Sequence, residues 1–313
     1  MKIAILDDWL DCALTSCDWS RLGDHVQIDV FRDTITGDPL VARLQPYDII
    51  CMMRERTPIT AAVMDKLPNL KGIVTSGMRN AALDIDAAKA RNIMLSGTGS
   101  PGHATSELAF SLIAMQARHL FESATSMRNG GWQTHLGRDL RGSNLGILGL
   151  GRLGGQLANY AKVFGMNIQA WSQNLTVERC NEVGVSYVDR DTLFKTSDFI
   201  SIHLKLSDRV RHLVAAKELA MMKPDAYLVN TSRAPIIDMQ ALTTALATGQ
   251  IAGAAIDVYD LEPVPADDPL RKTPNLLMTP HIGYVTRETM AIFYGETLEA
   301  VAAMIAGQPI RGL

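Results

Sequence analysis

The sequence is poor in cysteine and has no long apolar run, and each scarcity excludes a class of protein. Its four cysteines, at positions 12, 17, 51 and 180, show no Cys-x-x-Cys spacing, which argues against a disulfide-stapled fold and against a metal site. The richest apolar stretch, 108–115, is far shorter than the roughly 18 residues that cross a bilayer. The first apolar run, 3–6, is too short for a signal peptide and predicts a strand. We therefore expect a cytoplasmic protein with reduced thiols and no membrane contact.

The chain also lacks an excess of either charge. Its 30 Lys and Arg against 33 Asp and Glu leave a formal net charge of −3. A balance of this kind creates no field that gathers nucleic-acid phosphates, so we expect no nucleic-acid partner. What the chain does have is 47% hydrophobic residues over 313 positions, more than one core usually serves. This predicts two globular domains.

Short β-branched runs alternate with helix-length segments from the first residues onward. This rhythm is typical of parallel βαβ units. The first set of predicted strands covers 3–6, 26–31, 48–53, 72–76 and 93–95, and a long helical pattern over about 103–127 follows it. A second set is predicted at 145–149, 167–171, 199–203, 226–230, 254–258 and 276–279, before a last helix over 286–305.

A Gly-x-Gly-x-x-Gly turn lies between a predicted strand and a helix predicted over 155–164. The first glycine permits a tight turn, the second lets the backbone approach a pyrophosphate, and the third lets the helix pack on its strand. The helix amides then attract the anion. A glycine-rich turn that binds nothing is the alternative, which the flanking strand and helix disfavour. The predicted dinucleotide-binding residues of this turn are Gly149, Gly151, Arg152, Leu153 and Gly154.

The end of the next strand bears on which cofactor binds. An acid about 20 residues beyond the glycines usually holds the ribose hydroxyls and repels a 2′-phosphate. This chain has neutral Ser172 there, and either Arg152 or Arg179 could reach a phosphate. The sequence therefore allows NAD or NADP. The alternative, a polar strand end with no role, stays open.

Three chemical groups follow the ends of later strands in the second half of the chain. A doubly wound sheet places its ligand crevice at that edge. Arg233 can hold a carboxylate in a fixed plane and polarise a neighbouring carbonyl. His281 can exchange a proton near neutral pH, and a carboxylate such as Glu262 can fix its tautomer. Each residue alone is more often structural, but the three together suit the chemistry of a 2-keto acid.

The motifs that carry these groups resemble those of the D-isomer-specific 2-hydroxyacid dehydrogenase family over nearly the whole chain. They are Asn230-x-x-Arg233, Asp257-Val-Tyr-x-x-Glu262-Pro and Thr279-Pro-His281-x-Gly283, in this order. The resemblance implies an oxidoreductase that transfers a hydride between NAD(P)H and a small 2-keto acid or D-2-hydroxy acid. It assigns substrate binding to Arg233, acid/base catalysis to His281 and its orientation to Glu262. It also implies a homodimer that pairs through the 103–127 segment.

The same resemblance implies an α/β fold of two doubly wound parallel-sheet domains. One is a Rossmann NAD(P)-binding domain over 101–285, and the other is a flavodoxin-like substrate domain over 1–100 and 286–313. Further cofactor contacts are implied at Thr105, Ser172, His203, Leu204, Lys205, Thr231, Ser232, Asp257 and Gly283. Substrate contacts are implied at Arg54, Gly77, Met78 and Arg79, beside Arg233 and His281. For Arg54 and Arg79 a solvated surface position is the alternative, because loop arginines are common.

The chain departs from the family pattern at several of these positions. It has Ala234 where a glycine usually follows the arginine, Lys205 where a proline is frequent, and Met78-Arg79 where Val-Gly is common. A charged Arg79 would either favour a second anionic group on the substrate or close a small pocket. The particular hydroxy acid therefore stays open.

Two other functions compete with the dehydrogenase. An NAD(H)-sensing, corepressor-like binding protein would use the same fold, because fold alone does not determine function. A sensor would be free to lose Glu262 or His281, which this chain keeps. A hydrolase that oxidises its substrate transiently with bound NAD would need a lysine or cysteine constellation that the sequence does not show.

Overall fold

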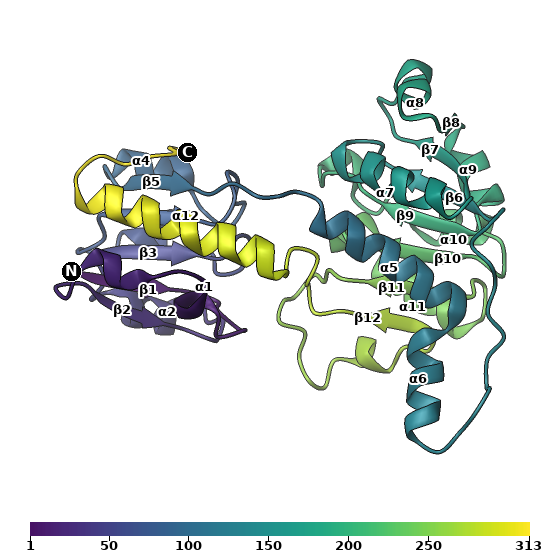
Figure 1. Ribbon diagram of the computed structural model, residues 1–313, viewed down its shortest axis with the longest axis horizontal. Helices are drawn as coiled ribbons and strands as arrows, with labels where there is room; N and C mark the ends of the chain where they lie inside the picture. The colour runs from purple at the N-terminus through teal and green to yellow at the C-terminus, as the bar shows by residue number, and fades with distance from the viewer. The chain divides into compact units, whose positions relative to one another are not determined.

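The computed structural model describes residues 1–313. The chain forms two compact units, one from Met1–Pro101 and Val285–Leu313, the other from Gly102–Tyr284 (Figure 1). We call them the split unit and the continuous unit. Each contains one parallel sheet with helices on both faces, so the predicted α/β class with two parallel sheets is confirmed. No helix combines the length and apolar character that crossing a bilayer requires.

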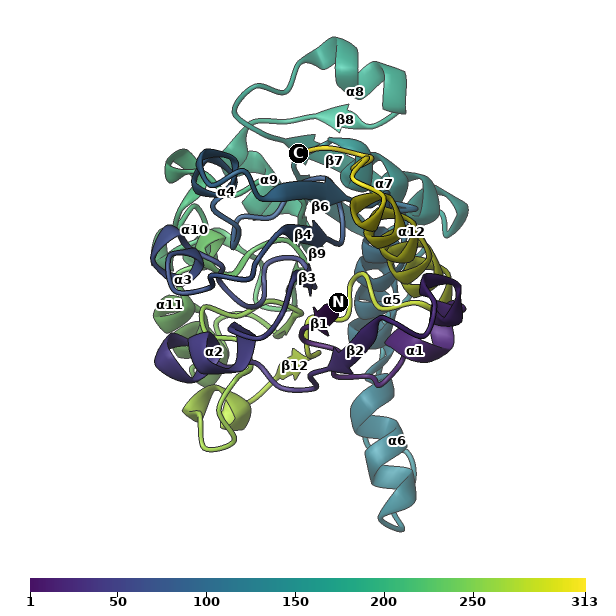
Figure 2. The ribbon, with the colours of Figure 1, turned by 90° about the vertical axis from the view of Figure 1, so that its left-hand side faces the viewer.

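The sheet of the split unit has five parallel strands in the order β2-β1-β3-β4-β5 (Figure 2). They are β1 (Lys2–Ile5), β2 (Gln27–Val30), β3 (Ile49–Met52), β4 (Gly72–Thr75) and β5 (Met94–Gly97). Every residue of β3 and β4 is buried, as expected for central strands covered on both faces. The strand order reverses between β1 and β3, so loops that leave the carboxyl ends there border a crevice.

Helices from both ends of the chain cover this sheet. They are α1 (Ala13–Ser16), α2 (Gly37–Leu44), α3 (Ala61–Met64), α4 (Ile85–Ala90) and α12 (Arg287–Ile305), with a 3-10 turn at Trp19–Leu22. Helix α12 begins where Thr286 Oγ1 accepts a hydrogen bond from the Thr289 amide at 3.1 Å. It packs on β4 and β5, and Phe293, Leu298 and Val301 are among its buried residues, so the chain's last segment completes the core that the first segment builds.

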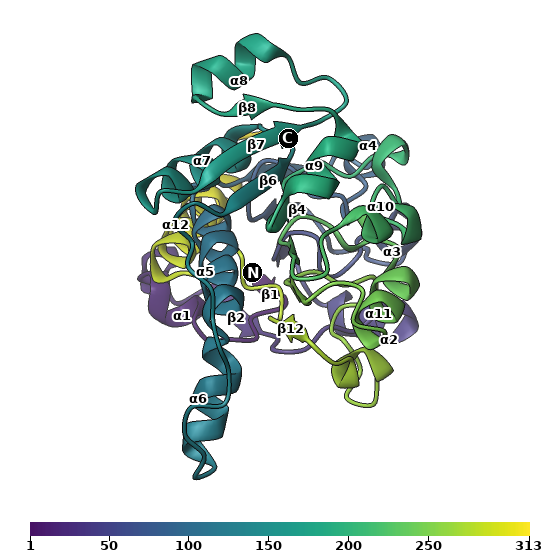
Figure 3. The same ribbon diagram turned by 90° about the vertical axis from the view of Figure 1, so that its right-hand side faces the viewer.

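The sheet of the continuous unit has seven parallel strands in the order β12-β11-β10-β9-β6-β7-β8 (Figure 3). They are β6 (Asn144–Leu148), β7 (Asn167–Trp171), β8 (Ser186–Tyr187), β9 (Phe199–Ile202), β10 (Tyr227–Asn230), β11 (Gly253–Ile256) and β12 (Leu276–Met278). Strand β8 was not predicted, because its two residues are exposed and give no apolar pattern. The order reverses between β6 and β9, which places the ligand crevice at the carboxyl ends of these two strands.

Two apolar layers cover the faces of this sheet. One face packs against α5 (Ala104–Arg118) and α7 (Arg152–Val163), and the other against α9 (Arg190–Thr196), α10 (Ala216–Met221) and α11 (Met239–Ala247). Helix α8 (Val177–Val183) lies beside β8 at the sheet edge. Because alternate residues of each strand point to opposite faces, Ile147 joins the first layer and Leu148 the second.

The single helix predicted over 103–127 is wrong. Helix α5 ends at Arg118, His119 adopts a left-handed conformation with φ 46°, and α6 (Leu120–Arg128) starts in a new direction. The His119 ring lies against Tyr227, with 3.5 Å between Nε2 and the Tyr227 hydroxyl. The helical period continues through the break, so the sequence pattern alone does not reveal it. Helix α6 buries none of its side chains and extends beyond the sheet (Figure 1).

Candidate active site

The glycine turn connects β6 to α7 at the point where the strand order reverses. Gly149 has φ 102°, a region that favours glycine, and its amide donates to the Trp171 carbonyl at 3.0 Å. A Cβ at Gly149 would lie 2.8 Å from the His203 carbonyl oxygen, and one at Gly154 would collide with the Gly149 backbone. A Cβ at Gly151 would meet nothing within 4 Å. Gly149 and Gly154 are therefore required by packing. Gly151 leaves open space over the start of α7, and this space suits a pyrophosphate.

Helix α7 begins at Arg152 rather than near residue 155. Gly151 is its N-cap residue, so the last glycine of the motif already lies inside the helix. The first helical amides therefore lie within the turn itself. This brings the positive end of the helix dipole closer to a bound anion than a later start would.

The end of β9 lies next to this turn. The His203 amide donates to the Leu148 carbonyl at 2.8 Å, and His203 Nε2 and Ser201 Oγ are 2.9 Å apart. Burial of the ring lowers the pKa of His203 to about 4. Leu204 and exposed Lys205 follow, and the Leu204 carbonyl accepts a hydrogen bond from Ser232 Oγ. The predicted cofactor residues 203–205 thus border the glycine turn.

The neutral His203 ring makes stability depend on pH. The unfolded chain takes up a proton below pH 6.5 whereas the folded state does so only near pH 4, so this stability is present above pH 6.5 and is lost as pH falls. Between pH 7.5 and 5 the expected loss from this group is about 2 kcal/mol. His203→Gln should remove that loss in urea unfolding at the two pH values. Exposed His25→Gln is the control, and an unchanged acid loss in His203→Gln would refute the assignment.

The loop after β10 presents Arg233. Asn230 closes the loop by donating from Nδ2 to the Arg233 carbonyl at 3.0 Å and accepting the Ser232 amide at 2.9 Å. Nη1 of the half-buried Arg233 donates to the Ser232 carbonyl at 2.7 Å, which fixes one arm of the guanidinium. The hydroxyl of Thr231 is buried and has no hydrogen-bond partner in the structure. An orphaned hydroxyl at the carboxyl edge of this sheet is a group that a bound ligand can satisfy.

His281 and Glu262 form a direct pair on the loops after β12 and β11. His281 Nδ1 lies 2.7 Å from Glu262 Oε2, and the two side chains are 19% and 16% exposed. The Tyr259 amide donates to Glu262 Oε1 at 2.9 Å, so the carboxylate is held from its other oxygen. The Tyr284 ring meets the imidazole edge-on at 5.9 Å. The imidazole is therefore fixed in orientation, with Nδ1 committed to the carboxylate.

Asp257 holds the turn that carries His281. Its carboxylate accepts hydrogen bonds from Thr279 Oγ1 at 2.6 Å and from the amides of Ile282 and Gly283, each at 2.8 Å. Burial raises the pKa of this carboxyl. Thr105 Oγ1 closes the same turn from α5 by donating to the Gly283 carbonyl at 2.9 Å. Both oxygens of Asp257 are thus used within the protein, whatever contact it makes with a cofactor.

The structure brings most of the predicted residues to one edge of the continuous unit. The glycine turn, His203, Arg233, Glu262 and His281 all follow the carboxyl ends of parallel strands that are adjacent in the sheet. Sequence reasoning assigned no role to Tyr259 or Asn230, which position Glu262 and Arg233 by the hydrogen bonds described above. The sequence signals for these roles were the asparagine that begins the Arg233 motif and the aromatic residue of the Glu262 motif.

The predicted substrate contacts of the split unit lie at the carboxyl ends of β3 and β4. The Arg54 amide donates to Ser76 Oγ at 3.0 Å, and its guanidinium approaches Gly77, where an added Cβ would lie 3.0 Å from Nη1. The Gly77 amide donates a hydrogen bond to Thr98 Oγ1 at 2.8 Å. Met78 and Arg79 are exposed on the same turn. These residues form one cluster within their own unit.

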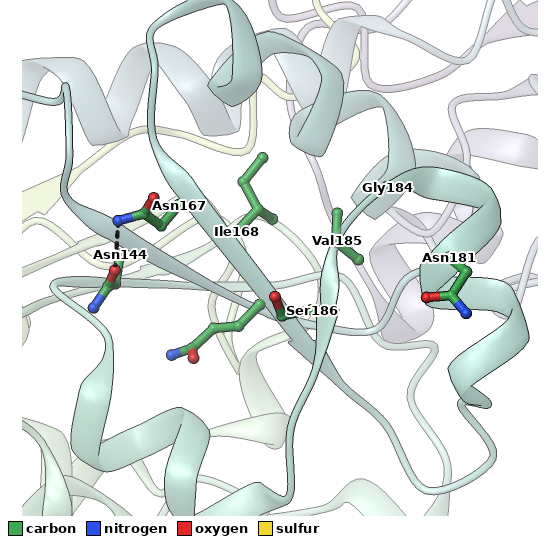
Figure 4. Close-up of a pocket in the computed structure, with 8 residues that line it drawn as sticks. Asn144, Asn167, Ile168, Asn181, Gly184, Val185 and Ser186 are labelled. Atoms are coloured by element: carbon green, nitrogen blue, oxygen red, sulfur yellow. Dashed lines mark hydrogen bonds between the residues drawn. The ribbon is translucent and has the colours of Figure 1, made fainter.

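A cavity of about 610 Å³ lies elsewhere in the continuous unit (Figure 4). Asn144 and Asn167, which begin β6 and β7, line it and are joined by a hydrogen bond of 3.1 Å. It therefore opens at the amino ends of the strands, opposite the edge that carries His281. No group of three or more His, Cys, Asp or Glu is arranged to hold a metal ion.

Comparison with known proteins agrees with this geometry. A family model described as D-isomer specific 2-hydroxyacid dehydrogenase, NAD binding domain, matches residues 110–283. The chain is 40% identical over 255 residues to a glyoxylate reductase of Thermococcus litoralis, covering 77% of this chain and 76% of that protein. It is 34% identical over 295 residues to a glyoxylate reductase of Korarchaeum cryptofilum, with coverage of 90% and 88%.

Solved structures support the same assignment over both units. A phosphoglycerate oxidoreductase of Vibrio cholerae matches with a TM-score of 0.92 at 34% identity, covering 98% of this chain and 99% of that chain. The chain therefore belongs to the D-isomer specific 2-hydroxyacid dehydrogenase family of oxidoreductases.

Proposed function

We propose that this enzyme interconverts a small 2-keto acid and its D-2-hydroxy acid, with Arg233, Glu262 and His281 as the residues of the reaction. The observation that carries the proposal is the His281–Glu262 pair at 2.7 Å, on the same sheet edge as the glycine turn and Arg233. The pair is intact, and nothing in the site favours the NAD(H)-sensing alternative.

Arg233 binds the substrate in this proposal. Its guanidinium stays charged at every physiological pH and presents a planar fork that matches a carboxylate. The Ser232 carbonyl fixes one arm of that fork. We assign the substrate carboxylate to the fork and its keto carbonyl to the imidazole. The developing negative charge on the carbonyl oxygen then lies near a fixed cation.

His281 transfers the proton. Glu262 accepts at Nδ1, and Nε2 is the nitrogen that we assign to the substrate. In the direction of reduction, Nε2 gives its proton to the keto oxygen as that oxygen gains the carbonyl π electrons. In the direction of oxidation, Nε2 takes the hydroxyl proton back. The nicotinamide cofactor, when bound, supplies or takes up the hydride.

The residues of the continuous unit fit a nicotinamide dinucleotide. Open space over Gly151 would receive the pyrophosphate, and the buried Thr231 hydroxyl would gain a partner. We assign the remaining cofactor contacts to Thr105, Ser172, His203, Leu204, Lys205, Ser232, Asp257 and Gly283. Substrate contacts beyond the triad are assigned to Arg54, Met78 and Arg79 of the split unit. The Gly77 amide is already engaged, so Gly77 acts through its conformation rather than by donating to substrate.

A panel of 2-keto acids tests the reaction. Glyoxylate is the first candidate because two relatives carry that name. Pure protein is mixed with glyoxylate, hydroxypyruvate, pyruvate and longer or dicarboxylic 2-keto acids, and the loss of NADH or NADPH absorbance is followed. We expect saturable turnover with at least one small 2-keto acid. Absence of turnover across the panel with both cofactors would overturn the proposal.

We also propose that the enzyme is a cytoplasmic homodimer that pairs through residues 120–137, which we call the arm. The arm exposes five large apolar side chains: Leu120 at 49%, Phe121 at 56%, Met127 at 58%, Trp132 at 73% and Leu136 at 95%. Apolar surface gathered on one projecting segment marks an interface. We assign this interface to a second copy of the chain, because a two-fold dimer uses the same surface patch on both subunits. The four cysteines are free thiols, which suits a reducing compartment.

Charged substitutions in the arm should break this dimer. The double variant Phe121→Asp, Trp132→Asp should raise the dimer dissociation constant at least about 30-fold, because two interfacial aromatics are lost. Sedimentation velocity over a concentration series measures it. The control is Leu14→Asp, which is equally exposed at 53% but lies in the split unit. A dimer that persists unchanged in the double variant would show that the arm is not the interface.

A further inference from the structure

The stretch from the start of β6 to the start of α8 contains no acidic side chain. Residues 140–177 include no Asp and no Glu, although they build the strand, glycine turn, helix and second strand of the dinucleotide fold. In that fold an acid at the end of the second strand, here β7, holds the ribose hydroxyls. No carboxylate of this stretch can therefore repel a phosphate on the ribose.

Ser172 stands at the position of that acid. It follows β7 directly, and β7 is joined to the glycine turn by the hydrogen bond from the Gly149 amide to the Trp171 carbonyl at 3.0 Å. The Ser172 carbonyl accepts the Leu175 amide at 3.0 Å and so closes the turn that leads to α8. The half-buried Ser172 is thus held beside the glycine turn, where the adenosine ribose of a dinucleotide lies.

The structure separates the two arginines that the sequence left as alternatives. The Arg152 guanidinium lies against Gly102, at the start of the segment that leads into α5. Arg179 projects instead from α8 toward the first turn of α7, where its Nη2 is 3.9 Å from the position of a Cβ on Gly155. Arg179 therefore lies beside the first turn of α7, whereas Arg152 faces Gly102.

Arg179 already pairs with Glu182, but the pair is exposed, so a more strongly charged ligand can replace the carboxylate. Its Nη1 is 2.8 Å from Glu182 Oε2 on the same helix, and the two side chains are 46% and 65% exposed. An exposed pair of this kind contributes little to stability. A phosphate carries about two negative charges and binds a guanidinium fork through two oxygens, so it competes well with a single exposed carboxylate.

We propose that Ser172 and Arg179 form a site for the 2′-phosphate of NADPH and make NADPH the preferred cofactor. Ser172 offers a hydroxyl without charge, and Arg179 supplies the cation. This inference rests on the nicotinamide-dependent function proposed above. Arg179 is then the residue that determines cofactor specificity, while the glycine turn binds the part that NADH and NADPH share.

Binding measurements test the site without turnover. Titration calorimetry on the full chain gives the Kd for NADPH, NADH, 2′,5′-ADP and 5′-AMP. The wild type should bind NADPH at least about tenfold tighter than NADH, and 2′,5′-ADP tighter than 5′-AMP. Arg179→Gln should weaken NADPH about 10- to 100-fold and leave NADH within about twofold. Ser172→Asp should reverse the preference, because a carboxylate repels the phosphate and accepts from the ribose hydroxyls.

Two matched variants decide whether the effect belongs to Arg179. Glu182→Gln removes the competing carboxylate and should tighten NADPH binding alone. Arg152→Gln should weaken both cofactors by the same factor or neither. Equal wild-type affinity for NADH and NADPH, or a preference that Arg152→Gln abolishes and Arg179→Gln does not, would overturn the proposal. A chain that binds NADPH as stated but reduces no 2-keto acid would contradict the proposed reaction and leave this site standing.

Discussion

Replacing His281 by alanine is expected to lower kcat for 2-keto acid reduction by about 10²- to 10⁴-fold, the usual contribution of a positioned general acid. The ring is the proposed proton donor, and its Nδ1 is held by Glu262 at 2.7 Å. Without it the keto oxygen must gain its negative charge with no proton donor in place. The Kd for the cofactor should stay within about twofold, since the glycine turn is untouched.

A matched control makes this prediction sharper. His25→Ala serves as the control because His25 is exposed in the split unit. A variant that keeps wild-type kcat would show that another group donates the proton.

The part of the site that could be predicted from sequence is the part that follows strand ends. The glycine turn after β6, Arg233 after β10 and His281 after β12 are each a few residues beyond a buried parallel strand. Since the carboxyl ends of parallel strands share one edge, their order along the chain already indicates that these side chains meet. The fold class follows from the same alternation of strands and helices.

Contacts between residues that are far apart along the chain could not be predicted from the sequence. The Asp257 carboxylate reaches the backbone amides of Ile282 and Gly283, and a backbone amide leaves no signature in a sequence. Likewise the bend at His119 depends on a left-handed residue that packs against Tyr227, and the helical period passes through it undisturbed. Local patterns specify elements, whereas the pairing of one loop with another depends on the folded sheet.

The position of Arg179 shows the same limit at the cofactor site. Sequence spacing left Arg152 and Arg179 equally placed, because both are within reach of the glycine turn along the chain. Only the packing of α8 beside β8 and the absence of a side chain at Gly155 direct Arg179 toward α7. The choice between the two arginines is thus a property of tertiary structure.

Replacing Arg233 by alanine is expected to lower kcat/KM for a 2-keto acid by about 10³-fold, because two charge-assisted hydrogen bonds to the carboxylate are lost. KM should rise because the carboxylate loses its anchor, and kcat should fall because the carbonyl oxygen loses its neighbouring cation. The loop itself should survive, since Asn230 holds it through the Arg233 carbonyl and the Ser232 amide rather than through the guanidinium. Cofactor affinity within about twofold of wild type checks that point.

Lysine at the same position separates charge from geometry. Arg233→Lys keeps the cation but loses the planar fork and the arm fixed by the Ser232 carbonyl, so it should recover less than about tenfold of the activity that alanine loses. Added guanidinium should raise the rate of Arg233→Ala and leave Arg91→Lys, a surface arginine paired with Asp65, unaffected. If lysine restored full kcat/KM, the site would need only a positive charge at this position, and the planar fork would have no role in orienting the substrate carboxylate.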